Sequence, residues 1–316
     1  MKKEQIQLLA IGDSSIDQIL SVEDNFATEQ NGEICFIHGT KIPVDSFNTS
    51  IAGNALNVSV GTQMLGVDTH VYTEVGDDQN AQRIIDELNA IGVNTKYCLK
   101  NKDTLTDIHP IIVYREERTI FIYHEKRDYK VRNWGPPKWI YYSSIGKNFE
   151  GFQKELVEYL NKNPKVGVAF NPGTYHLKGG VEAICDFLQI THILFVNKDE
   201  AIQLTENAEL LELHKNLQKL GPKLTVITDG GNGASAYDGK DLIHEPSYHQ
   251  NKPILDTTGA GDAFSSGFLA AIIHSRPLRE AVRWGVVNSS SVIREIGAIH
   301  GLKNQKEIKE MINYES

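Results

Sequence analysis

The chain has 316 residues, 40% of them hydrophobic, which is enough for one large domain or two small ones with a substantial core. Its net charge of -9 argues against a binding surface for nucleic acid or for an anionic membrane, because such surfaces need clustered Lys and Arg. A small anionic ligand remains compatible with this charge, since it responds only to its immediate surroundings. We therefore expect a globular protein with small-molecule ligands, no nucleic-acid partner and no membrane partner.

The three cysteines, Cys35, Cys98 and Cys185, are widely spaced and match no zinc-binding or redox motif. We expect them to be reduced thiols, as is usual in cytoplasmic proteins. The apolar run near the amino terminus is too short for a secretion signal or a membrane-spanning helix. The sequence therefore predicts a cytoplasmic protein.

Residues 5–11 form a short apolar run that ends at Gly12, which is typical of a central parallel strand buried on both faces. Asp13 and Asp17 follow the carboxyl end of this run. Ligands of open parallel sheets bind outside that edge, so both carboxylates could accept hydrogen bonds from substrate hydroxyls. The alternative for either residue is an ordinary turn or helix cap.

Two segments, approximately residues 18–48 and 105–125, read as short antiparallel strands outside the main sheet. Together they could form a small lid, which in group transfer excludes the water that competes as acceptor. Exposed edges of lid strands could also pair between chains, so we expect a homodimer through the lid. The cations near the lid would suit a phosphorylated acceptor or form a solvated face: Arg115, Arg118, Lys126 and Arg127.

Between the lid segments, residues 52–66 read as a helix of small and apolar residues that begins with Ala52-Gly53. Gly53 permits close approach of a ligand, and Asn57 carries an amide one turn later on the same face. An amide inside an apolar helix is either satisfied by the backbone or bonded to a ligand. Asn57 is therefore a second candidate for contact with the substrate.

From residue 69 onward, strands and helices alternate at lengths typical of a parallel sheet with helices on both faces. The predicted strands cover residues 69–73, 139–143, 166–170, 192–196 and 224–228, and the predicted helices residues 80–91, 149–162, 180–188, 198–205 and 209–220. No repeat or linker divides the chain. We expect one α/β domain over residues 1–316, with the lid segments inserted in it.

Polar motifs follow two predicted strands of the second half. Asn197 and Glu200 open a helix three residues apart, where they could hold a hydrated Mg²⁺ and a phosphate or form a capping box. Thr228 leads into a glycine-rich turn with Gly230 and Gly233, which suits backbone contact with a nucleotide. Neither a GxxxxGK[ST] phosphate loop nor a GxGxxG turn after the first strand occurs, which weakens a dinucleotide-binding interpretation.

Asn288 lies in a stretch of small residues, 284–291, that could flank an adenine ring or provide ordinary close packing between helices.

The most informative stretch is Asp-Thr-Thr-Gly-Ala-Gly-Asp at residues 256–262, which runs directly into an apolar helix. Gly259 and Gly261 let the backbone approach a ligand, and the amides of a helix start bind anions. A carboxylate at such a place would repel a phosphate unless it takes a proton from the group that attacks the phosphate. Asp262 is therefore either a general base or an ordinary helix cap.

Taken in order, these motifs resemble the ribokinase-like carbohydrate kinases, also called the phosphofructokinase-B family, from Gly12 to about Ala298. The stretch at 256–264 is the most specific part of the match. The resemblance implies a three-layer α/β/α sandwich with a mostly parallel central sheet and a small β-strand lid. It also implies transfer of the γ-phosphoryl group of MgATP to a hydroxyl of a pentose, a hexose or a sugar acid.

The resemblance further implies a role for each motif. Asp262 would be the base, and the amides of Gly259, Ala260 and Gly261 would form the anion hole. Asp13, Asp17, Gly53 and Asn57 match positions that bind sugar hydroxyls. Asn197 and Glu200 match an element that acts on Mg²⁺ and phosphate, Thr228 and Gly230 match contacts to ATP, and Asp256 and Thr258 match positions beside a monovalent cation such as K⁺.

One departure argues against a simple ribokinase. The family usually has two glycines where this chain has Ala52-Gly53, and ribokinases proper carry Lys where this chain has Asn54. A nucleoside kinase of the same fold is the nearest alternative, because the same groups suit a ribose. A non-catalytic regulator that binds sugar or nucleotide is the alternative from another class, and a nicotinamide-dependent oxidoreductase is the least favoured.

Overall fold

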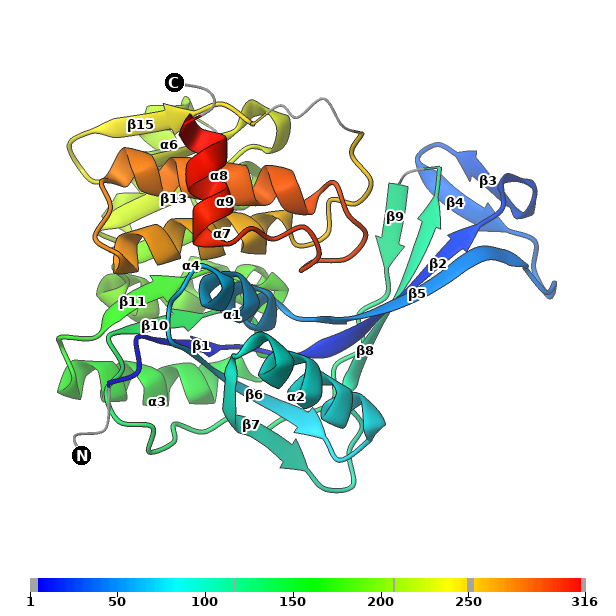
Figure 1. Ribbon diagram of the computed structural model, residues 1–316, viewed down its shortest axis with the longest axis horizontal. Coiled ribbons are helices and arrows are strands. Elements are labelled where there is room, and N and C mark those ends of the chain that lie inside the picture. Colours follow the sequence, from blue (N-terminus) through cyan, green and yellow to red (C-terminus); the bar gives the residue numbers. More distant parts are fainter. Residues whose placement is uncertain (1–4, 116, 207, 249–252, 314–316) are drawn as a thin grey trace.

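The computed structural model describes residues 5–115, 117–206, 208–248 and 253–313. Its centre is a sheet that has nine strands within these residues, in the order β15-β14-β13-β12-β11-β10-β1-β6-β7 (Figure 1). All neighbours pair in parallel except β13 with β14 and β14 with β15. The strands are β1 Leu8–Ile11, β6 Thr69–Gly76, β7 Asn94–Asn101, β10 Trp139–Tyr142, β11 Gly167–Phe170, β12 Ile193–Asn197, β13 Leu224–Thr228, β14 Ala234–Tyr237 and β15 Leu242–Glu245.

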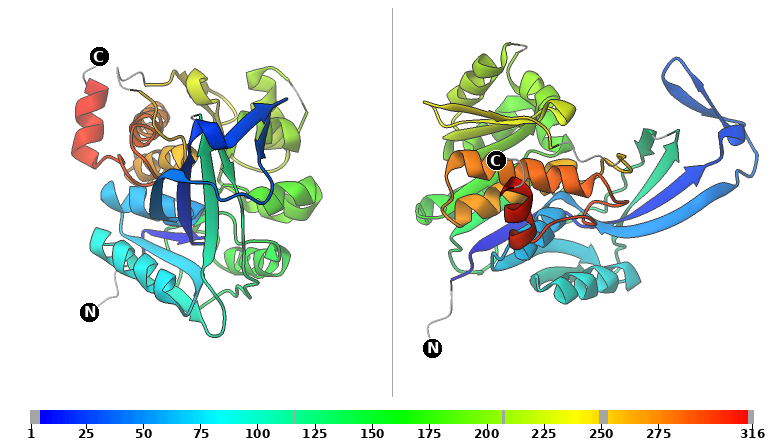
Figure 2. Two further views of the ribbon diagram at one scale, coloured as in Figure 1. Left: turned by 90° about the vertical axis from the view of Figure 1, so that its right-hand side faces the viewer. Right: turned by 45° about the horizontal axis from the view of Figure 1, so that its top comes forward.

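Helices cover both faces of this sheet, which confirms the predicted three-layer α/β/α arrangement (Figures 1 and 2). One face carries α3 Phe149–Lys162, α4 Thr174–Ile190, α5 Lys198–Leu204 and α6 Leu210–Lys219. The other face carries α1 Asn54–Met64, α2 Gln79–Ile91, α7 Ala260–Ile273, α8 Leu278–Val292 and α9 Gln305–Asn313.

Strand β1 is covered by helices on both faces of the sheet. Its four residues are completely buried, and successive side chains point to opposite faces. Leu9 and Ile11 join the core under α3 and α4, whereas Leu8 and Ala10 join the core under α7 and α8. A strand with both faces covered must be apolar throughout, as the sequence predicts.

A second sheet, here called the small sheet, extends from the carboxyl edge of the central strands (Figures 1 and 2). It has the order β5-β2-β8-β9, with β2 Ser15–Val22, β5 Val44–Ala52, β8 Asp107–Tyr114 and β9 Glu117–Ile120. Parallel pairing of β2 with β8 joins the two separate lid segments. A hairpin of β3 Ala27–Gln30 and β4 Glu33–Phe36 follows the short turn η1 Asp24–Phe26.

Several elements differ from the sequence prediction. Strand β7 was not predicted, because as the outer strand of the sheet it alternates half-buried and exposed residues instead of forming an apolar run. Helix α4 begins at Thr174, six residues before the predicted start at Gly180, where the backbone has φ 72° and the helix is kinked. Helix α8 begins at Leu278, ahead of the predicted small-residue stretch.

Cys35, Cys98 and Cys185 are all free. Among the described residues, we find no helix that combines the length and the apolar character needed to cross a membrane.

Candidate active site

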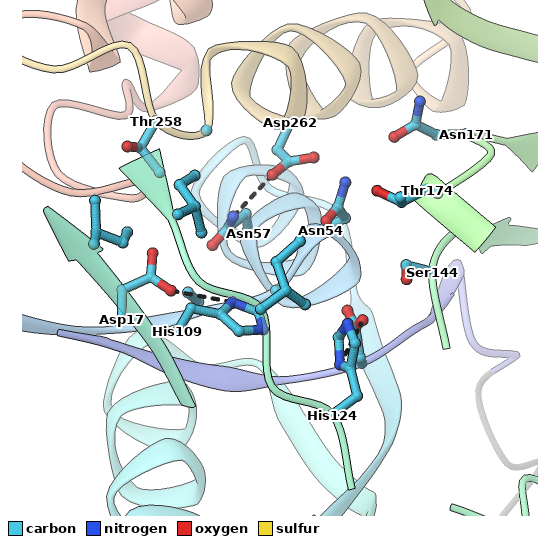
Figure 3. A pocket seen from close by; sticks show the side chains of 18 of the residues that line it. Asp17, Asn54, Asn57, His109, His124, Ser144, Asn171, Thr174, Thr258 and Asp262 are labelled. Carbon is cyan, nitrogen blue, oxygen red and sulfur yellow. Dashed lines mark hydrogen bonds and ion pairs between the residues drawn. The ribbon is translucent and has the colours of Figure 1, made fainter. Parts of the chain in front are cut away.

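A cavity of about 530 Å³, here called the first cavity, lies where the small sheet faces the carboxyl edge of the central sheet. Side chains from strands, loops and helix starts far apart in the sequence converge on it (Figure 3). Its lining includes Asp13, Asp17, Gly53, Asn54, Asn57, His109, Ile111, Arg118, Ile120, Ile122, His124, Ser144, Asn171, Thr174, Glu200, Thr257, Thr258, Gly259 and Asp262. All four residues predicted to contact substrate hydroxyls are in this set.

Gly53 has a structural reason to be glycine. It is the N-cap of α1 with φ 124°, and a Cβ atom there would collide with the carbonyl oxygen of Asp13. The start of α1 therefore passes directly over the end of β1, which brings Asn57 close to Asp13 and Asp17. Gly53 lines the cavity, and its lack of a side chain is what allows this crossing.

Asp262 lies in the first turn of α7 and is 8% exposed. Asn57 Nδ2 donates a hydrogen bond of 2.8 Å to Asp262 Oδ2, while Asn57 Oδ1 is buried without a hydrogen-bond partner. Asn57 Nδ2 thus orients the carboxylate of Asp262, and Asn57 Oδ1 remains available to accept a hydrogen bond beside it. Sequence reasoning predicted the residue Asn57 but not this contact.

The environment of Asp262 favours its protonated form. Burial raises the pKa of Asp262 to about 7, and the nearby charges of Asp13, Glu200 and Asp17 act in the same direction against the hydrogen bond from Asn57. A carboxylate with a pKa near neutrality is suited to accept a proton from a hydroxyl under physiological conditions.

The start of α7 forms a cradle for an anion. Gly259 is its N-cap in the left-handed conformation, with φ 73°, and a Cβ atom there would lie 2.6 Å from Cβ of Ala298. Gly261 has no heavy atom near the position of its absent Cβ. Gly259, Ala260 and Gly261 line a second cavity of about 210 Å³ together with Asn197, Glu200, Thr228 and Asp262. A helix of 14 residues offers unpaired amides and the positive end of its dipole there.

A third cavity of about 100 Å³ continues beyond the second. Thr228, Ala260 and Gly261 line both, and the third cavity adds Gly230 and Gly233 from the turn after β13. Glu200, Thr257, Gly259 and Asp262 are shared between the first and second cavities. The three cavities therefore adjoin in a row, with the start of α7 at the centre.

The structure places Asn288 differently from the predicted contact with ATP. It is completely buried, and its Nδ2 donates to Ala263 O and Ser266 Oγ, each at 3.0 Å, while its Oδ1 accepts from Lys303 N–H. Its polar atoms thus hold α8 against α7 and do not face the third cavity. The residues of α8 that line this cavity are Val286, Ser289 and Ser290.

Asn197 and Glu200 form a reciprocal capping box. Asn197 Oδ1 accepts from Glu200 N–H at 2.9 Å, and Glu200 Oε2 accepts from Asn197 N–H at 2.8 Å. Glu200 still lines the first and second cavities, and burial raises its pKa. The described residues contain no cluster of three His, Cys, Asp or Glu suited to a metal. Glu200 is the residue that would hold Mg²⁺ through water.

Two histidines of the first cavity were missed by sequence reasoning. His109 Nδ1 lies 3.5 Å from Asp17 Oδ1 and 3.2 Å from Ser15 Oγ, and His109 Nε2 is buried without a partner (Figure 3). His124 Nδ1 lies 2.8 Å from Asp107 Oδ2 and 3.9 Å from Asp13 Oδ2. Both belong to the second lid segment: the pairing of β8 with β2 sets His109 opposite Asp17, and the contact with Asp107 holds His124 near Asp13.

The Asp262→Asn variant should become more stable than the wild type as the pH rises, because the wild type loses stability. The folded state holds the Asp262 proton more tightly than the unfolded chain, so the stabilisation from this residue is complete below pH 4 and is lost as the pH approaches 7. Asn carries no charge at any pH. We expect the melting temperature of the variant to exceed that of the wild type at pH 8 and to approach it below pH 4.

The control is Asp86→Asn on the exposed side of α2. The difference in melting temperature between this control and the wild type should not change with pH. A melting-temperature difference for Asp262→Asn that is the same at both pH values would contradict the raised pKa.

Comparisons with known proteins agree with this arrangement. Residues 5–305 match the model of the pfkB family carbohydrate kinases. The ATP-dependent 6-phosphofructokinase of Thermoanaerobacterium thermosaccharolyticum is 25% identical over 290 residues, which cover 87% of this chain and 88% of that protein. The nucleoside kinase of Methanocaldococcus jannaschii is 23% identical over 97% of this chain and 96% of its own length.

The crystal structure of ribokinase from Cryptococcus neoformans in complex with ADP has the same fold. It superimposes with a TM-score of 0.78 at 18% sequence identity, over 96% of this chain and 99% of that chain. Because the family match spans nearly the entire sequence and the fold agrees, the chain belongs to the pfkB family of carbohydrate kinases.

Proposed function

We propose that this protein transfers the γ-phosphoryl group of ATP to a hydroxyl of an uncharged sugar or similar polyol. The observation that carries the proposal is the position of Asp262, which lines both the first cavity and the second cavity at the glycine-rich start of α7. A hydroxyl in the first cavity and a phosphate in the second would meet at this carboxylate.

The chemistry follows from this position. Asp262 takes the proton of the acceptor hydroxyl, the hydroxyl oxygen forms a bond to the γ-phosphorus, and the bond from that phosphorus to the bridging oxygen breaks to release ADP. The amides of Gly259 and Gly261 stabilise the charge on the transferred group, whereas Ala260 N–H donates to Thr257 O at 3.3 Å. Mg²⁺, when bound with ATP, neutralises phosphate charge, and Glu200 would hold it through water.

The third cavity is assigned to the remainder of the nucleotide. Thr228, Gly230 and Gly233 on one side and Val286, Ser289 and Ser290 on the other line a space adjacent to the phosphate cradle. Backbone groups of the turn after β13 and small side chains of α8 suit a flat base without charge.

The lining of the first cavity supports an uncharged acceptor. Asp13, Asp17 and Asn57 offer acceptors for several hydroxyls, and Ile111, Ile120 and Ile122 give the small-sheet side an apolar surface. The one Lys or Arg in the described lining is Arg118, and this guanidinium is paired with Asp256. The phosphate of a phosphorylated acceptor would therefore face the carboxylates of Asp13 and Asp17. It would find no unpaired Lys or Arg side chain in the described lining to bind it.

The other lid cations named from the sequence, Arg115, Lys126 and Arg127, are not part of the lining of the first cavity. Arg127 is buried against Asp107 and the backbone of Leu105, and Arg115 is exposed and lies 3.7 Å from Asp24. A nucleoside is the second candidate acceptor, because the three isoleucines could cover the flat face of a base while the aspartates bind the ribose.

A coupled ADP-release screen with MgATP tests the proposal. Pentoses, hexoses, sugar acids, phosphosugars and nucleosides should be compared, and we expect turnover with an uncharged sugar or a nucleoside and little with phosphosugars. Asp262→Asn should lower turnover by roughly 10²-fold or more with little change in ATP binding, since it removes the base. Turnover of this variant within a few-fold of the wild type, or preference for a phosphosugar, would refute the assigned roles.

Alanine at two glycines should separate folding from phosphate binding. Gly259→Ala should destabilise the fold, because φ 73° and contact with Ala298 both oppose a side chain. Gly261→Ala should leave the melting temperature nearly unchanged, because space is open around this position, but its methyl group would occupy the phosphate cradle. We expect Gly261→Ala to lower kcat by about tenfold or more. Wild-type kcat in Gly261→Ala would argue against phosphate binding at this helix start.

We also propose a homodimer through the small sheet. Large apolar side chains are exposed on it or directly after it, including Phe47 of β5 at 58%, Ile120 of β9 at 45% and Phe121 at 52%, and β5 and β9 are its outer strands. Light scattering at micromolar concentration should give twice the chain mass, and Phe47→Glu should reduce it. Leu211→Glu on α6 is the control, because Leu211 is also exposed but lies outside the small sheet. A monomeric wild type would rule this out.

A cytoplasmic location is part of the proposal, and it is supported by the three unpaired thiols.

A further inference from the structure

Arg118 of the small sheet reaches across to the loop that leads into α7. It lies on β9 opposite Val113 of β8, and its side chain is 17% exposed. One terminal nitrogen contacts Asp256 Oδ1, and the other donates to Thr257 Oγ1 at 2.7 Å. A single side chain therefore joins the lid to the residues directly before the phosphate cradle.

The carboxylate of Asp256 is already fully engaged in this arrangement. Its Oδ1 accepts from Thr258 N–H at 2.7 Å as well as from Arg118, and its Oδ2 accepts from Gly297 N–H at 2.9 Å. Burial opposes its charge, but the hydrogen bonds from Thr258 and Gly297 and the Arg118 guanidinium lower the pKa of Asp256 overall. Asp256 is thus an anion whose counter-charge is provided by the protein.

This arrangement does not fit a monovalent cation beside Asp256 and Thr258, which the family resemblance implies. A bound cation and the guanidinium would share Asp256 Oδ1 and repel each other. Thr258 Oγ1 is buried without a hydrogen-bond partner within the usual geometric limits, and it lies beside the same carboxylate, whose pKa it helps to lower.

We propose that Arg118 is a positioning residue whose guanidinium takes the place of the monovalent cation beside Asp256, so that phosphoryl transfer by this chain needs no such cation. The inference rests on the proposed kinase function of the same site. Its physical basis is that the loop 256–258 leads directly to Gly259–Gly261, and Ala260 N–H donates to Thr257 O at 3.3 Å. Holding Asp256 and Thr257 therefore holds the amides that face the phosphate.

The same contact links the acceptor side to the donor side. Arg118 lines the first cavity beside Ile120 and Ile122, so the side chain that holds the loop 256–258 also belongs to the small-sheet wall of this cavity. A free ion could not provide this coupling.

The test compares the wild type with Arg118→Ala in ADP release at equal ionic strength in KCl, NaCl and tetramethylammonium chloride. The wild type should have the same rate in all three salts. Arg118→Ala should lose about tenfold or more in kcat in tetramethylammonium chloride, with a smaller change in the acceptor KM, and KCl should restore part of the loss. Arg115→Ala, on the same hairpin but 56% exposed, is the matched control and should resemble the wild type.

A second readout does not depend on turnover. KCl, relative to tetramethylammonium chloride, should raise the melting temperature of Arg118→Ala but not that of the wild type, because only the variant exposes Asp256 and Thr258 to an ion. If Arg118→Ala does not fold, Arg118→Lys keeps the charge and should remain independent of KCl, with a lower kcat because it loses the contact to Thr257.

Any one of three results would overturn the inference. The wild-type activity could require K⁺, the wild-type melting temperature could rise specifically with KCl, or Arg118→Ala could keep the wild-type kcat in all salts. Failure of the kinase proposal is distinguishable, because ADP release would then be absent for every acceptor while the melting-temperature comparison still reports on the cation.

Discussion

The buried contact between Asn57 and Asp262 joins the two helices on which the site is built. A carboxylate at 8% exposure among other carboxylates is costly to ionise, and it is held in place by one amide donor 205 residues away in the sequence. This contact requires α1 and α7 to pack closely. Gly61 makes that possible, because a side chain at this position would collide with Ser266 of α7. The catalytic proposal therefore depends on helix packing as much as on the residues of the site.

The row of three cavities explains how one short segment can serve two ligands. Residues 259–262 start a helix, so amides point in one direction along its axis, while the Asp262 side chain extends sideways toward α1. Backbone amides therefore face the second cavity and side chains face the first. Asp13, Asp17 and two histidines from the second lid segment also line the first cavity, where His109 lies 3.5 Å from Asp17 and His124 lies 3.9 Å from Asp13.

Most of the site residues could be predicted because of a simple rule of parallel sheets. Asp13, Asn197 and Thr228 lie at or just after the ends of β1, β12 and β13, and the carboxyl ends of parallel strands meet at one edge. His109 and His124 could not be predicted in this way. His109 follows from the pairing of β8 with β2, a contact between segments more than 80 residues apart whose register no local pattern specifies, and His124 from its contact with Asp107.

The sequence by itself determined the layered α/β fold and the glycine-rich start of α7, because apolar strand runs, alternating helices and a glycine-rich helix start are local patterns. Only the tertiary structure decided how the remaining side chains are used. Asn288 turned out to hold two helices together, and Arg118 became the counter-charge of Asp256. The physical reason is that a polar side chain bonds to whatever lies within its reach, and its neighbours across the fold are set by packing over long sequence distances.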